Sequence, residues 1–259
     1  MEEPQTISGT PPLPPRATSL AARLLNVFAA PGEVFAEVQA APPTHANWIV
    51  PVLISAAVGA LAAFLIFSQP AVVQRLHDQW TQGIDQLVKD GRTSPAEAKE
   101  FTALAEKFLV PRTLQIFFSL AAVVGSAVRV FWWGFVLWLG ARLFLKVRVN
   151  YFKAAEMTGL ATMISVLGVI ATVLLVVNVG NLFSAPGEVL TAGDLAAQKD
   201  SGILIGTLNV FAFWFIGVLA SGLARLAGVP FGRAMFLVLA CWLFQELALI
   251  LLGLGGMAL

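Results

Sequence analysis

The sequence predicts an all-α protein: a polytopic membrane bundle of five transmembrane helices, with N-terminal interfacial helices and an extracytoplasmic helical hairpin. Five apolar stretches occur between Trp48 and Leu259, and each exceeds the roughly 20 residues that a helix needs to cross a hydrocarbon core of about 30 Å. Hydrophobic residues make up 58% of the 259 residues and charged residues 12%, whereas soluble domains are about a quarter charged. Because the hydrocarbon core offers backbone amides no water, these stretches are expected to be helices.

Residues 1–17 are expected to form a disordered, proline-rich tail, and residues 18–259 the membrane domain. The tail starts with two glutamates and lacks the basic start and apolar core of a secretory signal peptide. Its composition cannot bury enough apolar surface to fold. A proline-motif ligand is the alternative, since four of its prolines can hold an extended left-handed helix: Pro11, Pro12, Pro14 and Pro15.

Two short helices are expected between Thr18 and Ala40, and both are too short to span a membrane. Pro31 separates them and suits the first turn of the second helix. The first helix has an apolar face that includes Phe28, and the second has one that includes Phe35. In the second helix, Glu33, Glu37 and Gln39 are expected to face away from the apolar side. We expect these interfacial helices to pack under the bundle, with Phe28 and Phe35 largely buried.

The spans are expected at about residues 48–68, 114–141, 157–183, 203–225 and 234–258. A helical hairpin is expected between the first two, at residues 70–110. Its first helix repeats apolar residues every three or four positions and ends at Gly91. Its second helix starts with Ser94 and Glu97 at the spacing of a capping box. The balanced charges of the hairpin indicate a solvated surface, and a partner-binding surface is the alternative.

The basic residues predict the orientation. The connection between the second and third spans carries Arg142, Lys146, Arg148 and Lys153, whereas the segment 184–202 has one lysine and three acidic residues. Short connections rich in Lys and Arg stay in the cytoplasm. We therefore expect an inner (plasma) membrane protein with a cytoplasmic N-terminus and an extracytoplasmic C-terminus.

Arg129 and Glu246 are the charges inside the apolar stretches. Arg129 precedes Arg142 by thirteen residues, and Glu246 follows Arg233 by thirteen, so both are expected about 20 Å from the inner ends of their helices. A buried ion pair would neutralise both charges. Such a pair is either a static clamp between two helices or part of a polar transport site, with Asn178, Asn209 and Gln245 as possible neighbours.

The sequence gives no sign of an enzyme, a metal site or a cofactor site. It contains one cysteine, Cys241, and two distant histidines, His45 and His77, which cannot supply a thiolate–imidazole metal set. No phosphate-binding loop, zincin motif or nucleophile elbow is present. A net charge of +1 argues against a nucleic-acid partner.

Several segments resemble bacterial proteins of the Yip1 family. They are residues 23–28 (RLLNVF), 31–35 (PGEVF), Trp48 with Pro51 at the start of the first span, and 208–214 (LNVFAFW) continuing to the turn at 228–234 (GVPFGRA). The resemblance covers roughly residues 19–253 and implies a five-span domain. Eukaryotic members act in secretory trafficking, partly by contacting small GTPases. Their acidic-aromatic motif is not evident here, so the GTPase role is not carried over.

Two functional hypotheses follow. The first is a non-enzymatic Yip1-type protein that organises membrane or acts as a scaffold for partners, with the lipid bilayer, other proteins or further copies of itself as contacts. The alternative is a small transporter or channel subunit that uses a buried polar site formed by Arg129 and Glu246.

Overall fold

The computed structural model describes residues 18–179 and 210–252, and the regular elements of these two ranges are all α-helices. Five of the helices are long and apolar enough to cross a membrane: α3 (Ala46–Phe67), α6 (Pro111–Leu143), α7 (Tyr151–Val179), α10 (Val210–Ala227) and α11 (Phe231–Leu251). The prediction of an all-α, five-span membrane protein is confirmed. The tail at residues 1–17 and the segment 184–202 lie outside the described residues.

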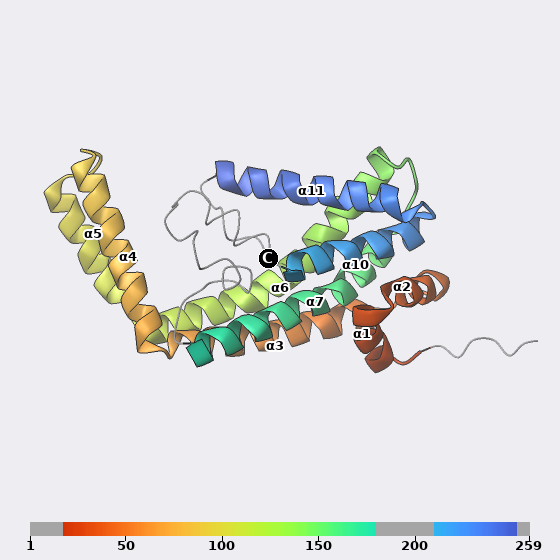
Figure 1. Ribbon diagram of the computed structural model, residues 1–259, viewed down its shortest axis with the longest axis horizontal. Coiled ribbons are helices and arrows are strands. Elements are labelled where there is room, and N and C mark those ends of the chain that lie inside the picture. The colour runs from red at the N-terminus through yellow and green to blue at the C-terminus, as the bar shows by residue number, and fades with distance from the viewer. Residues whose placement is uncertain (1–17, 180–209, 253–259) are drawn as a thin grey trace, which may run out of the picture.

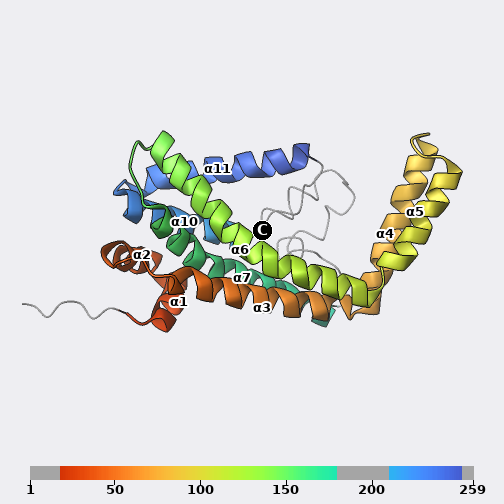
Figure 2. The same ribbon diagram turned by 180° about the vertical axis from the view of Figure 1, so that it is seen from behind.

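The long helices form two packed groups. Helices α3, α6 and α7 lie against one another, and α10 joins α7 to α11 (Figures 1 and 2). The core where the groups meet contains fully buried side chains from three helices, including Leu137, Leu160 and Leu219. Close contact between α3 and α7 depends on Gly159, because a Cβ atom there would lie 2.6 Å from Trp48 Cα.

The third span begins earlier than the hydropathy pattern predicts. Helix α7 starts at Tyr151 rather than at residue 157, so Lys153 and Glu156 are part of the helix and both are buried. Hydropathy excludes these two residues from the span because it scores each charge as if it stood alone. In the folded chain their charges have partners, which removes much of the cost of burial.

Helices α1 (Leu20–Ala29) and α2 (Pro31–Ala40) pack against one end of the bundle, where they contact α7 and α10 (Figure 1). Phe35 is completely buried, as predicted. Phe28 is half-buried and meets Trp214 edge to face, with 5.9 Å between ring centroids. The Glu37 side chain is 40% exposed, and its carboxylate pairs with Arg23 on α1 at 3.7 Å.

Helices α4 (Pro70–Lys89) and α5 (Pro95–Phe108) form the predicted pair of helices at the opposite end of the bundle from α1 and α2 (Figures 1 and 2). Gly91 between them has a φ of 67°, a left-handed conformation that glycine adopts without strain. The capping box is present: Ser94 Oγ accepts from the Glu97 amide at 3.2 Å, and the Ser94 amide donates to Glu97 Oε2 at 2.8 Å. Local sequence therefore determines how α5 begins.

Candidate functional site

Arg129 and Glu246 are located on two neighbouring helices, α6 and α11, but the structure does not join them. Neither the Arg23–Glu37 nor the Lys153–Glu156 ion pair includes Arg129 or Glu246. Glu246 is buried, with its Oε1 atom lacking a hydrogen-bond partner. Arg129 lines a groove on the side of α6 that faces α3 and α7. A direct pairing of these two residues stays a prediction.

Of the three expected polar neighbours, Gln245 has a described partner. Its Oε1 atom accepts a hydrogen bond of 2.7 Å from Trp132 Nε1 on α6. Gln245 adjoins Glu246 in α11, and Trp132 follows Arg129 by three residues in α6, so this contact places the two neighbouring segments at the same level of the bundle. Asn178 belongs to α7, but its side chain is outside the described part, and Asn209 is outside the described residues altogether.

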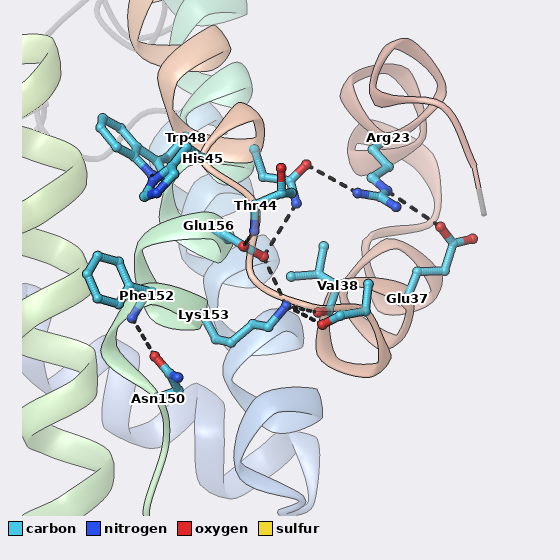
Figure 3. Close-up of polar contacts among 12 residues, drawn as sticks. Arg23, Glu37, Val38, Thr44, His45, Trp48, Asn150, Phe152, Lys153 and Glu156 are labelled. Atoms are coloured by element: carbon cyan, nitrogen blue, oxygen red, sulfur yellow. Dashed lines mark hydrogen bonds and ion pairs between the residues drawn. The ribbon is translucent and has the colours of Figure 1, made fainter.

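The main concentration of buried polar groups lies elsewhere, where α1 and α2 meet the ends of α3 and α7. We call these residues the amino-terminal polar cluster: Arg23, Glu37, Asn47, Lys153 and Glu156. Figure 3 labels its four charged members. At its centre, Lys153 Nζ lies 3.3 Å from Glu156 Oε2, and the side chains are 9% and 2% exposed. The spacing of three residues places both on one face of α7.

Lys153 also fixes the end of α2. Its ammonium group donates to the carbonyl oxygens of Val38 and Ala41, at 2.5 and 2.7 Å. The last carbonyls of a helix have no partner within the helix and carry partial negative charge, so a cation is well placed there. The ammonium group of Lys153 is therefore stabilised both by the carbonyl oxygens at the end of α2 and by the Glu156 carboxylate.

Glu156 accepts hydrogen bonds from the segment that leads into α3. The Thr44 amide donates to its Oε1, and Asn47 Nδ2 donates to its Oε2 at 3.4 Å. Asn47 is itself 1% exposed. With Lys153 at the same oxygen as Asn47, the carboxylate has three donors, which is a favourable environment for a buried anion.

Asn47 connects this centre to α1. Its Oδ1 atom accepts from Arg23 Nη1 at 3.3 Å, and Arg23 Nε lies 3.7 Å from Glu37 Oε2 (Figure 3). Thr18 Oγ1 also donates to Glu37. The cluster contains two cations and two carboxylates, so its formal charge is zero. It links α1, α2, α3 and α7 through one continuous set of contacts.

A small pocket of about 150 Å³ opens beside Glu156. Aromatic rings of His45, Trp48 and Phe152 are among the side chains that line it. Trp48 Nε1 donates to His45 Nδ1 at 3.2 Å, and the His45 and Phe152 rings meet edge to face. These contacts hold the rings in place at the end of the bundle. Within the described ranges, no group of three or more His, Cys, Asp or Glu side chains is arranged to hold a metal ion.

Sequence reasoning missed the amino-terminal polar cluster. It assigned Lys153 to a basic connection and placed the start of the third span beyond Glu156. A local signal was available, since Lys153 and Glu156 have the i, i+3 spacing of a helical ion pair. The partners Asn47 and Thr44 could not be found, because they lie 109 and 112 residues away from Glu156.

Comparison with known protein families agrees with this architecture. The profile of the Yip1 domain matches residues 25–254, which is nearly the whole described chain. A search of curated proteins and a search of solved structures each found no match. The matched range includes the five membrane-spanning helices and four of the five members of the amino-terminal polar cluster, all except Arg23. The chain belongs to the Yip1 family of multi-pass membrane proteins.

Proposed function

We propose that this protein is a non-enzymatic scaffold that organises membrane or partner proteins through its helical surfaces. The observation that supports this role most directly is the amino-terminal polar cluster. Lys153 donates hydrogen bonds to the end of α2, and Glu156 accepts hydrogen bonds from Asn47 and from the segment before α3. These two buried charged residues therefore hold α1 and α2 on the bundle, so that the two helices form one rigid surface.

The outer faces of the bundle are suited to lipid. Large apolar side chains on α6 and α11 are more than half exposed, among them Phe117, Leu120, Phe236 and Phe244. In a membrane these faces contact acyl chains, which have no polar groups to satisfy. We further propose an inner-membrane location with α1 and α2 on the cytoplasmic side, as the basic connection at Arg142 and Arg148 indicates.

A crosslinking experiment in cells tests the scaffold proposal. Leu25 on α1 is 71% exposed, so a photoactivatable amino acid at this position should form discrete protein adducts. The same adducts should weaken when Lys153→Met releases α2, and persist in the matched control Arg148→Met, which removes an exposed cation. Adducts that are absent, or that do not depend on Lys153, would contradict a docked scaffold surface.

One observation favours the second candidate, a small transporter or channel subunit. Arg129 lines a groove with hydroxyl side chains inside a membrane-spanning helix, and a charge at that depth is costly and often functional. Proteoliposome uptake with a panel of ions and metabolites tests it. Flux that disappears in Arg129→Gln would support transport, and its absence across the panel would leave the scaffold role favoured.

A further inference from the structure

Arg129 faces a groove of about 160 Å³ between α3, α6 and α7. The polar side chains that line the groove around it are Ser55, Ser126, Thr162 and Ser165. The lining residues in the described chain include no carboxylate. The groove therefore presents one cation and several hydroxyl groups, and nothing that neutralises the cation.

Two groups in this groove can donate hydrogen bonds to a ligand, the Arg129 guanidinium and the Ser55 hydroxyl. Arg129 belongs to neither the Arg23–Glu37 nor the Lys153–Glu156 ion pair, and Ser55 Oγ is buried without a hydrogen-bond partner. Two other hydroxyls already donate to backbone carbonyls, Ser126 to Val123 at 2.8 Å and Thr162 to Gly159 at 2.6 Å. What the groove lacks is an acceptor that carries negative charge.

The position of Arg129 along α6 explains why the guanidinium group needs a negatively charged acceptor. It lies fourteen residues before Leu143, the last residue of the helix, which is about 20 Å from that end. A guanidinium group this far inside a membrane-spanning helix has little access to water and needs a counter-charge. Its planar fork of N–H donors matches the two oxygens of a carboxylate or phosphate.

We propose that the groove binds an oxyanion, a carboxylate or phosphate group, through Arg129 and Ser55. Ala121 and Gly125 line the groove, and the residues that precede them on α6, Leu120 and Val124, are 62% and 55% exposed and suit an acyl chain attached to that group. The site is separate from the scaffold surface, and it gives the transport alternative a ligand class. Oxyanion binding can be measured separately from transport. A protein that transports nothing can therefore be distinguished from one whose groove binds no oxyanion.

Native mass spectrometry of the full chain in a neutral detergent tests the proposal with three probes: oleate, phosphatidic acid and inorganic phosphate. Arg129→Gln should weaken the adducts at least about tenfold, the effect expected for a charge-assisted hydrogen bond. Gly125→Leu should do the same with Arg129 intact, because Gly125 lines the groove and a Cβ atom added there meets no atom within 4 Å. This second variant keeps the test valid if Arg129→Gln does not fold.

Two matched controls should bind like the natural chain. Arg142→Gln removes an exposed cation from the same helix, and Gly217→Leu adds the same bulk on α10, where an added Cβ atom also meets no atom within 4 Å. Adducts with oleate or phosphatidic acid alone identify an oxyanion from the bilayer, and adducts with inorganic phosphate identify one from water. The proposal is overturned if no probe binds, or if binding is unchanged in both Arg129→Gln and Gly125→Leu.

Discussion

Lys153 Nζ and Glu156 Oε2 lie 3.3 Å apart on the first turns of α7, almost completely buried. Each has further partners on a different part of the chain: Lys153 on the end of α2, and Glu156 on Thr44 and Asn47. This ion pair therefore connects the start of α7 to the end of α2 and to the segment that leads into α3.

Removing one charge of the pair should destabilise the protein more than removing both. Lys153→Met leaves Glu156 buried without its cation and frees the carbonyls of α2, so the free energy of unfolding should fall by about 3–5 kcal/mol. Adding Glu156→Leu should recover part of this loss, as measured by denaturation in detergent. Arg148→Met, at an exposed cation, is the control. Strictly additive losses in the double variant would contradict the coupling.

Asn47 should act as the connector between α1 and the centre of the cluster. Asn47→Leu removes the acceptor of Arg23 and a donor to Glu156, so α1 should open more often. Hydrogen exchange at the amides of residues 20–40 should become faster, while exchange in α11 stays the same. Asn26→Leu, on the exposed side of α1, should leave these rates unchanged. Equal rates in the two variants would argue against the connector role.

Gly159 should tolerate no side chain. The Cβ of Gly159→Ala would lie 2.6 Å from Trp48 Cα and 2.7 Å from the Asn47 carbonyl oxygen. Both are backbone atoms that cannot rotate away, so α3 must shift and the variant should lose at least about 1–3 kcal/mol of stability. Gly217→Ala, with no atom within 4 Å, is the control for the glycine-to-alanine change. A Gly159→Ala protein with an unchanged melting temperature would refute this close packing.

The capping box of α5 should respond to acid. Backbone and side-chain hydrogen bonds with Ser94 hold the pKa of Glu97 below its ordinary value. A lowered pKa stabilises the folded helix above the ordinary carboxyl range, and this contribution disappears as the pH falls through the lowered pKa. Ser94→Ala removes the side-chain hydrogen bond and keeps the backbone one, so it should raise the pKa of Glu97 part of the way towards its ordinary value, which NMR titration of the labelled carboxyl measures.

Thr102→Ala is the control for the capping box, because the Thr102 hydroxyl donates to Ala98 O in the same helix and does not contact Glu97. The titration of Glu97 in this variant should match that of the natural chain. An equal midpoint in Ser94→Ala would show that the Ser94 side chain does not contribute to the lowered pKa of Glu97.

The proposed orientation predicts which connections a membrane-impermeant thiol reagent can reach. With Cys241 replaced by alanine, a cysteine at Asn150 should be labelled in permeabilised cells alone, and a cysteine at Asp90 in intact cells as well. Both positions are exposed on the protein, so burial does not complicate the comparison. The reverse pattern would place α1 and α2 outside the cytoplasm.

The sequence by itself determined the features that depend on neighbours along the chain. Runs of apolar residues predicted five membrane-spanning helices, and Ser94 with Glu97 predicted the start of α5. These predictions succeed because hydropathy and capping involve residues within one helix or one turn. The helix break at Pro31 belongs to the same class.

The tertiary structure decided which charges are buried with partners. Hydropathy excluded Lys153 and Glu156 from the third span, yet α7 includes them, because their partners arrive from α2 and from Asn47, 109 residues away from Glu156. For the same reason, the depth of Arg129 could be calculated from the sequence, but the groove it faces could not. The energy of a buried charge depends on what the fold brings next to it, and a single sequence does not record those neighbours.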